Sequence, residues 1–298
     1  MREIVVISGK GGAGKTSIAG AFAHLAEGAV LCDLDVDAPD LHLLLDPRHL
    51  AEHDFLSGNE AIIDPEMCIG CGQCAELCRF DAIAGPQSED GTAYRVLPFR
   101  CEGCKVCVEL CPTQAIAFPQ RHCGEWYISD TRFGTMVHAQ LFPGEENSGR
   151  LVTLLKREAR TIAEERGLDL VLSDGAPGIG CPVISSLAGT NLAVLVTEPT
   201  PSGMHDLMRV AELCDGFRTR VAVIINKWDI NPAQADAISA YCSGKGYPVV
   251  GRLPHDRAVT DAMVNRQVVT EYEHGDLSAT LKAAWTDTLA LLDADKGT

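Results

Sequence analysis

Cysteine is the residue type whose number and spacing in this chain point most directly to chemistry. The 298 residues include 13 cysteines, and eight of them form two groups with one spacing, C-x2-C-x2-C-x3-C. The first group is Cys68, Cys71, Cys74 and Cys78, and the second is Cys101, Cys104, Cys107 and Cys111. Thiolates bind soft metals, and a reducing compartment disfavours a disulfide framework, so we interpret both groups as metal ligands.

The two groups belong to an internal repeat with a period of 33 residues. Residues 68–83, CIGCGQCAELCRFDAI, are echoed by residues 101–116, CEGCKVCVELCPTQAI. The repeat resembles two-cluster ferredoxins, in which the fourth cysteine of each group binds the other group's [4Fe-4S] cluster. Zinc, the alternative metal, is bound at other spacings. By this resemblance the first cluster uses Cys68, Cys71, Cys74 and Cys111, and the second uses Cys78, Cys101, Cys104 and Cys107.

A second chemical motif lies near the start of the chain. Residues 9–16 read GKGGAGKT and fit the P-loop pattern G-x-x-x-x-G-K-[ST], between a strand-like run and a helical pattern. In this motif backbone N–H groups surround the phosphates, Lys15 binds the terminal phosphates and Thr16 binds Mg²⁺. A glycine-rich turn without a ligand is the alternative. We expect nucleotide contacts from Gly9, Lys10, Gly11, Gly12, Ala13, Gly14, Lys15, Thr16 and Ser17.

Lys10 adds information because phosphate binding alone does not require a lysine early in the loop. With it, KGGAGKT resembles the deviant Walker A ATPases, the family of MinD, ParA, Mrp-type scaffold proteins and the nitrogenase iron protein. In that family this lysine crosses a dimer interface to the partner's nucleotide. The resemblance therefore implies a nucleotide-dependent homodimer in which Lys10 and Lys15 act in catalysis. A solvated loop lysine is the alternative for Lys10.

The same resemblance assigns roles to aspartates at the ends of two expected strands. In CDLDVDAPDLHLLL, which is similar to the family's second motif, Asp35 would position or activate the attacking water. Asp33 or Asp37 would lie near Mg²⁺ or its waters, although a helix cap is the alternative for Asp37. Asp174 would hold Mg²⁺ through water, and the Gly178 amide would sense the γ-phosphate.

A base-binding segment is expected at residues 221–229, VAVIINKWD. Its Asn226, Lys227 and Asp229 resemble the NKxD of GTP-binding proteins and also the adenine-contacting asparagine of the MinD group. Pro254, in GRLPHD, matches a second base-side position in that family. These residues alone are therefore compatible with either adenine or guanine. We favour ATP over GTP because the early lysine is typical of proteins that use ATP.

Strand-like runs alternate with helical patterns along most of the chain. The runs are residues 4–8, 29–33, 168–173, 192–197, 221–226 and 248–253. This alternation predicts an α/β fold with a mostly parallel sheet flanked by helices. One interruption divides it, so we predict a P-loop NTPase domain at 1–63 and 119–298 with a small ferredoxin-like insert for two [4Fe-4S] clusters at 64–118. Residues 124–142 indicate irregular strands. Residues 144–149, GEENSG, indicate a turn, and we assign them no chemical role.

Composition and charge narrow the classes of partner. The formal net charge of -16 would repel a nucleic-acid backbone, so we expect no nucleic-acid partner. No apolar h-region follows Arg2 and Glu3, and the C-terminal helical pattern has Lys282 as its one basic residue. We therefore expect a cytoplasmic protein without a membrane partner.

Five cysteines lie outside the repeat. The helical patterns around Cys214 and Cys242 predict small core residues. Cys181 and Cys123 could contact a metal or a partner, although core packing is the alternative for both. The complete set is Cys32, Cys123, Cys181, Cys214 and Cys242.

Two functions are compatible with these motifs. The first is an ATPase that couples ATP binding and hydrolysis to electron transfer or metallocluster maturation on a redox or metallocluster-bearing partner protein. The alternative is an iron-sulfur cluster carrier or scaffold for which ATP is an assembly signal. Both require two [4Fe-4S] clusters, ATP and Mg²⁺.

Overall fold

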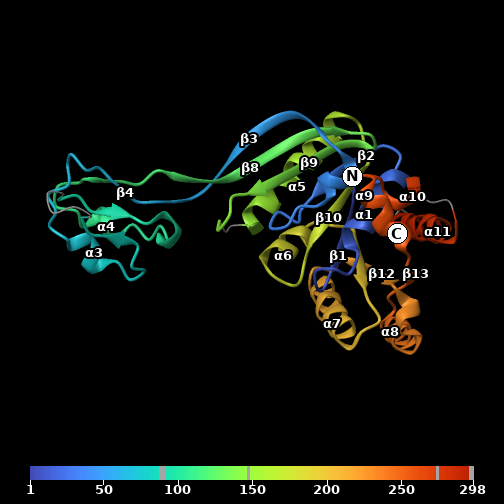
Figure 1. Cartoon of the computed structure of the whole chain (residues 1–298). Helices are drawn as coiled ribbons and strands as arrows, with labels where there is room; N and C mark the ends of the chain where they lie inside the picture. The colour runs from blue at the N-terminus through green and yellow to red at the C-terminus, as the bar shows by residue number, and fades with distance from the viewer. Residues whose placement is uncertain (87–91, 146–147, 273–274, 295–298) are drawn as a thin grey trace. The chain divides into compact units, whose positions relative to one another are not determined.

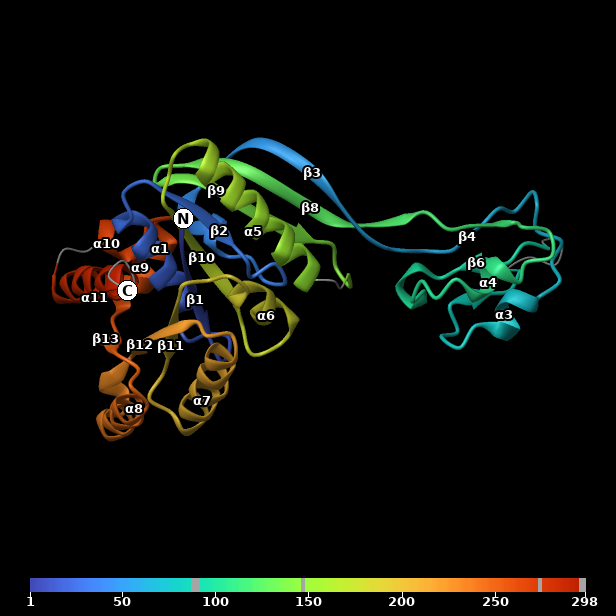
Figure 2. The same ribbon diagram turned by 180° about the vertical axis from the view of Figure 1, so that it is seen from behind.

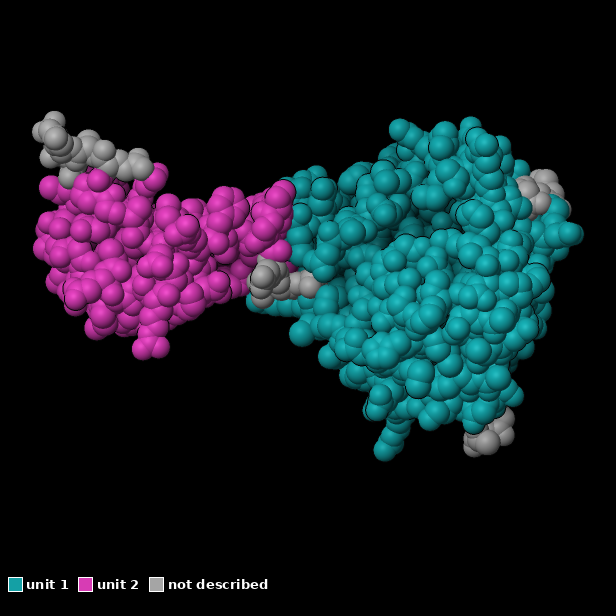
Figure 3. All heavy atoms as spheres, turned by 60° about the horizontal axis from the view of Figure 1, so that its bottom comes forward, with its two compact units in different colours: residues 1–53, 125–141, 147–298 teal, residues 54–124, 142–146 magenta. Residues whose placement is uncertain are grey.

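The computed structural model describes residues 1–86, 92–145, 148–272 and 275–294. They form two compact units, which Figure 3 colours separately. The first unit contains residues 1–53, 125–141 and 147–298, and the second contains residues 54–124 and 142–146. The second unit extends beyond residues 64–118 because its boundaries fall inside two long strands, β3 (Arg48–Asn59) and β8 (Gln120–Thr131).

A nine-stranded sheet in the order β13-β12-β11-β1-β10-β2-β9-β8-β3 organises the first unit (Figure 1). Its other strands are β1 (Arg2–Ser8), β2 (Ala29–Asp33), β9 (Gly134–Leu141), β10 (Leu170–Pro177), β11 (Leu192–Thr197), β12 (Arg220–Asn226) and β13 (Val249–Leu253). The strands from β13 to β9 pair in parallel, which confirms the predicted α/β fold. The carboxyl ends of these strands therefore lie at one edge, where α/β proteins place their sites.

Helices cover both faces of this sheet (Figures 1 and 2). Alternate residues of β1 face opposite sides, so Ile4 and Val6 join one core while Val5 and Ile7 join the other. Phe22 packs against Trp285 in the first core, with ring centroids 4.9 Å apart. The helices are α1 (Lys15–Leu25), α2 (Leu41–Leu45), α5 (Ser148–Glu165), α6 (Cys181–Leu187), α7 (Pro201–Gly216), η2 (Trp228–Ile230), α8 (Pro232–Lys245), α9 (Arg257–Val264), α10 (Val269–Tyr272) and α11 (Asp276–Asp293).

Among the described residues, every helix is too short or too polar to span a lipid bilayer.

The β3, β8 and β9 edge of the sheet differs from the sequence expectation. Residues 124–142 form the regular hairpin of β8 and β9 instead of irregular strands, and the Thr131 hydroxyl closes its turn by donating to the Gly134 carbonyl at 2.7 Å. The pattern gave no indication of β3, because Phe55 and Ser57 are its two buried residues and charged or histidine side chains occupy half of the other positions. Without apolar alternation, an edge strand resembles a polar loop.

The second unit repeats its own structure with the period of the sequence. Its elements are β4 (Ile62–Ile63), α3 (Gln73–Leu77), β5 (Ile83–Ala84), β6 (Arg95–Val96), η1 (Pro98–Arg100), α4 (Val106–Glu109) and β7 (Ile116–Ala117). Antiparallel pairing joins β4 to β7 and β5 to β6, so each small sheet takes one strand from each half. Backbone angles repeat too, because Gly70 (φ 69) corresponds to Gly103 (φ 62) and Asp81 (φ 49) to Gln114 (φ 54).

A cluster of aromatic rings packs α2 against the β3, β8 and β9 edge. His138 of β9 is 5% exposed, and its Nε2 lies 2.8 Å from the Ser129 hydroxyl. The rings of His42, His49 and Tyr127 surround it with centroids 6.3, 5.5 and 5.1 Å away. Burial first, and then the nearby His49 and His42, lower the pKa of His138 from 6.5 to about 3. The imidazole is therefore neutral in the folded protein at neutral pH.

This neutral histidine makes stability depend on pH. Because the folded-state pKa lies below the unfolded value of 6.5, its contribution is present above pH 6.5 and is lost as pH falls. Between pH 7.5 and 5.5 the protein should lose about 1.4 kcal/mol of unfolding free energy that a His138→Gln variant keeps. Urea denaturation at both pH values measures the difference. The exposed His205→Gln variant should match the wild type, and equal losses in all three proteins would contradict the assignment.

Candidate functional site

The P-loop connects the end of β1 to the start of α1. Gly12 and Gly14 have φ angles of 82° and 89°, in the left-handed region that favours glycine. At Gly14 a Cβ atom would lie 2.3 Å from the Asn226 side-chain nitrogen, so glycine is also required for space. Asn226 in turn donates to the Ala13 carbonyl at 2.8 Å. The loop is therefore held against the end of β12.

Lys15 is the centre of a buried charge cluster at the carboxyl ends of β2 and β10. Its Nζ lies 2.6 Å from Asp174 Oδ1 and 3.3 Å from Asp35 Oδ2. Burial opposes its charge, but Asp174, Asp35 and then Asp33 outweigh burial and raise the pKa of the lysine. The same burial, with the neighbouring carboxylates, raises the pKa of Asp35 despite the opposing effect of Lys15.

The carboxylates exceed the cations in this cluster, which suits a bound metal ion. Asp33 is buried and accepts hydrogen bonds from the amides of Asp35 at 3.1 Å and Leu41 at 3.2 Å. Burial, and then Asp174, raise the pKa of Asp33 well above its usual range. Asp174 Oδ2 is buried and has no hydrogen-bond partner among the described residues, although buried acceptors normally have one. A water of hydrated Mg²⁺ is a suitable donor to that oxygen.

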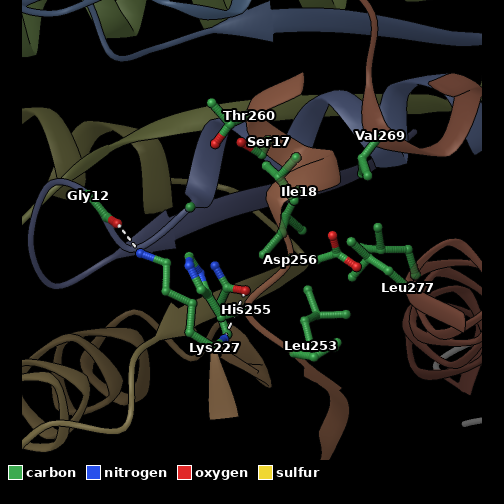
Figure 4. Close-up of a pocket in the computed structure, with 15 residues that line it drawn as sticks. Gly12, Ser17, Ile18, Lys227, Leu253, His255, Asp256, Thr260, Val269 and Leu277 are labelled. Carbon is green, nitrogen blue, oxygen red and sulfur yellow. Dashed lines mark hydrogen bonds between the residues drawn. The ribbon is translucent and has the colours of Figure 1, made fainter. Parts of the chain in front are cut away.

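A cavity of about 250 Å³ adjoins the P-loop on the side of Asn226 and Pro254 (Figure 4). Gly12, Gly14 and Ser17 line one side of it, while Leu253, Pro254 and His255 line another. Asn226 and Lys227 line it too, so the structure brings both together with Pro254. Apolar walls with a few convergent polar groups are typical of a base-binding pocket.

Asp229, the fourth base-side candidate, is placed differently. Its Oδ1 accepts a hydrogen bond of 2.6 Å from the His255 amide, and the residue is absent from the lining of the cavity. The carboxylate therefore fixes the backbone beside Pro254, and a base in the cavity would meet Asn226 before Asp229.

Glu198 is a site residue that the sequence analysis missed. It follows β11, and its carboxylate lies 2.5 Å from Lys227 Nζ and 3.4 Å from Lys10 Nζ. Partial burial raises its pKa, but Lys227 and Lys10 outweigh burial and lower the pKa overall. An acid directly after a buried strand was the available signal. Gly178, predicted to sense phosphate, instead donates its amide to the Ser8 carbonyl at 2.8 Å.

The second unit gathers the eight repeated cysteines around two cavities. One cavity is lined by Cys68, Cys71, Cys74 and Cys111. The other is lined by Cys78, Cys101, Cys104 and Cys107. Each cavity therefore combines three cysteines of one half with the fourth cysteine of the other half, which is the arrangement that the ferredoxin resemblance implies.

The surroundings of the thiols fit an iron-sulfur cluster. The amides of Ala82 and Ala115 donate to Cys78 Sγ at 3.4 Å and Cys111 Sγ at 3.3 Å, and these two contacts are equivalent in the repeat. Burial raises the pKa of Cys111, but hydrogen bonds from Ala115 and Thr113 outweigh it and lower the pKa overall. A lowered pKa favours the metal-binding thiolate at Cys111, whereas burial raises the pKa of Cys74 and Cys107.

The five remaining cysteines separate by burial. Cys181 is exposed at the start of α6, and the other four are buried. Cys123 donates its thiol hydrogen to the Ser57 carbonyl at 3.1 Å. Burial raises the pKa of Cys214 to about 12 and of Cys242 to about 11, as expected for core thiols. GEENSG contributes nothing further, because its residues 146 and 147 lie outside the described residues.

Comparisons with known proteins bear on both sites. A family of 4Fe-4S dicluster domains matches residues 61–118. The uncharacterized protein MJ0578 of Methanocaldococcus jannaschii is 35% identical over 232 residues, which are 77% of this chain and 79% of that protein. The MinD protein of Pyrococcus horikoshii, solved with Mg-ADP, has a TM-score of 0.56 at 16% identity and covers 99% of both chains. A chain of the MinC:MinD complex of Aquifex aeolicus has a TM-score of 0.58 at 15% identity, with 97% of this chain and 96% of that chain covered. At these identities the solved structures show the fold.

Gly103 offers a test of the second cysteine cavity. A Cβ atom there would lie 2.5 Å from the backbone oxygen of Asn59, at a φ of 62°. Gly103→Ala should therefore distort the Cys101 to Cys104 turn and lower the iron content of anaerobically purified protein by about half. Lys105→Ala, at a residue with a φ of 68° and an exposed side chain, is the control and should keep its iron. Stoichiometric zinc in the wild type, or equal iron in both variants, would count against the cluster assignment.

Proposed function

Because this chain belongs to the same family as the Methanocaldococcus jannaschii protein MJ0578 and joins a MinD-type fold to a 4Fe-4S dicluster domain, we propose that it is an ATPase acting on a partner protein. ATP binding and hydrolysis would control electron transfer to that partner or maturation of its metallocluster. The working form is a nucleotide-dependent homodimer. A cytoplasmic location and the lack of a nucleic-acid partner stay predictions from the sequence.

The Lys15 charge cluster is the observation that carries the ATPase proposal. A lysine that is 6% exposed lies among Asp33, Asp35 and Asp174, directly beside a loop whose amides can surround phosphates. Thr16, Asp33 and Asp174 would hold Mg²⁺ or its waters, and Mg²⁺ would neutralise charge on the transferred phosphoryl group. Asp35, whose pKa is raised, would orient the attacking water and accept its proton.

The base pocket supports ATP over GTP. In an NKxD site the final aspartate is the residue that would have to reach the base, but Asp229 is bound to the His255 amide. Asn226, Lys227 and Pro254 remain along the cavity to contact the base. Adenine therefore matches this pocket better than guanine does.

Coupling between the nucleotide and the clusters would follow a route that begins at Gly178 and α6. Gly178 would exchange its bond to the Ser8 carbonyl for one to the γ-phosphate, and α6 begins three residues later. α6 packs closely on α5, where a Cβ at Gly149 would lie 3.1 Å from Cys181 Cβ. Residues 142–145 of the second unit come before α5 in the chain, and residues 146 and 147, which separate them, lie outside the described residues. A cluster carrier would also contain this route, but it would release its cluster to an apo-protein.

Two substitutions separate nucleotide binding from hydrolysis. Lys15→Ala should weaken ATP binding by about 100-fold or more, because it leaves three carboxylates facing the triphosphate. Asp35→Asn should bind ATP normally and lower kcat by about 100-fold to 10,000-fold, because water activation matters in the transition state. Calorimetry and phosphate release measure the two effects. The exposed Asp37→Asn variant is the control and should keep the wild-type kcat. If it loses as much kcat as Asp35→Asn does, the role of orienting the attacking water is not specific to Asp35.

Coupling requires that nucleotide changes both oligomeric state and cluster behaviour. With Mg²⁺ and a non-hydrolysable ATP analogue, the protein should form dimers in analytical ultracentrifugation and show a shifted cluster reduction potential. Lys10→Ala should bind the analogue but lose both responses, whereas the exposed Lys245→Ala should keep them. Identical behaviour of the wild type in its apo, ADP and analogue-bound states would mean that the two units only share a chain.

A further inference from the structure

The internal repeat makes the two cysteine cavities directly comparable, and their entrances differ. Cys68, the first cysteine of one half, is flanked by Met67 and Ile69, whereas its counterpart Cys101 is flanked by Arg100 and Glu102. Met67 is 48% exposed and Ile69 is 62% exposed, and Ile69 also lines the cavity of the Cys68 group. Apolar side chains are therefore presented to solvent on both sides of Cys68, whereas Cys101 has charged neighbours and the exposed apolar residue that lines its cavity is Phe80.

The charges around the two entrances differ in the same way. The half that contains Cys101 pairs Lys105 with Glu109 at 2.6 Å. At the equivalent positions the other half has Gly72 and Glu76, so the acid is retained without the lysine. Asp64 and Glu66, both exposed, precede Met67. The apolar pair therefore lies within an acidic segment, in a unit that carries twelve acidic and five basic residues.

The Cys101 entrance packs instead on segments of its own unit that lead to β3, β8 and α5. Gly103 lies against the Asn59 carbonyl, and Arg121 donates to the Pro98 carbonyl at 3.0 Å. Phe99 is 81% exposed, but its ring lies beside Gly144, where an added Cβ atom would be 3.6 Å from the ring. Gly70, the counterpart of Gly103, lies against Thr92, between the two halves of the repeat. The two entrances therefore contact different segments of this unit.

We propose that Met67 and Ile69, with the acidic Asp64, Glu66 and Glu76, form the docking face for a redox protein whose cofactor edge is apolar and ringed by basic side chains. This inference rests on the proposed electron-transfer function. Opposite charges would steer the partner, and the apolar pair would exclude water at the centre of the contact. One electron would pass from a reduced cluster at Cys68, Cys71, Cys74 and Cys111 to the oxidised cofactor of the partner, with no bond made or broken.

Oxidised cytochrome c, a small haem protein ringed by lysines, is a suitable probe of this face. Calorimetry at low ionic strength should detect its binding to the cluster-loaded protein, and added salt should weaken that binding. Met67→Ser combined with Ile69→Ser should raise Kd by about tenfold, and Met67→Ser alone by about threefold. Stopped-flow oxidation of dithionite-reduced protein should slow in the same order. Iron content is measured on each variant because Ile69 lines the cavity of the Cys68 group, whereas Met67 does not line it and Met67→Ser alone should keep the wild-type iron content.

The repeat supplies a matched control at the equivalent positions. Arg100→Ser combined with Glu102→Ser should leave Kd within about twofold of the wild type. The proposal is overturned if that double variant loses as much affinity as the Met67 and Ile69 variant. It is also overturned if the wild type does not bind cytochrome c, or binds an acidic flavodoxin equally well. Absence of ATP hydrolysis on the same preparation would count against the proposed function alone, because docking needs no nucleotide.

Discussion

The interaction on which the candidate nucleotide site depends is the buried contact of the Lys15 ammonium with Asp174 and Asp35. It joins the first residue of α1 to the ends of β10 and β2, so three separate segments meet at one charge. Burying these groups costs desolvation energy. The attraction between opposite charges and the hydrogen bonds from backbone amides to the Asp33 carboxylate offset that cost. Removal of the lysine would leave like charges together. The site is therefore assembled by its own electrostatics before any ligand arrives.

Excess negative charge in that cluster also explains how the loop can respond to a ligand. Lys15 and Gly178 both have internal partners, the Asp174 carboxylate and the Ser8 carbonyl, in the structure. Lys10 and Lys227 share Glu198 in the same way. A triphosphate with its cation can replace each acceptor by another without leaving a buried group unpaired. Ligand binding would therefore exchange hydrogen-bond and ion-pair partners without leaving buried groups unpaired, so the rearrangement of the loop would cost little free energy.

The sequence predicted the parts of the molecule in which local pattern and global fold agree. Every strand-like run that was both apolar and flanked by turn residues became a strand of the parallel sheet, and the resemblance to two-cluster ferredoxins predicted which thiols share a cavity. The sequence pattern did not predict β3, because an exposed edge strand needs no alternation of apolar and polar residues. Glu198 and the bond from the His255 amide to Asp229 depend on how distant segments meet, and no local pattern contains that information.

The exchanged fourth cysteine has a consequence for how the protein is made. Each cavity contains thiols from both halves of the repeat, so the Cys68 cavity is incomplete until Cys111 has been synthesised. The two small sheets are shared in the same way, because β4 pairs with β7 and β5 pairs with β6, and β7 and β6 belong to the second half of the repeat. Neither cavity therefore has its full set of thiols until most of the second half has been synthesised, so cluster assembly would follow translation of most of the repeat. An intact repeat is thus a checkpoint in biogenesis, since a truncated one would present thiols to the cell without a completed cavity.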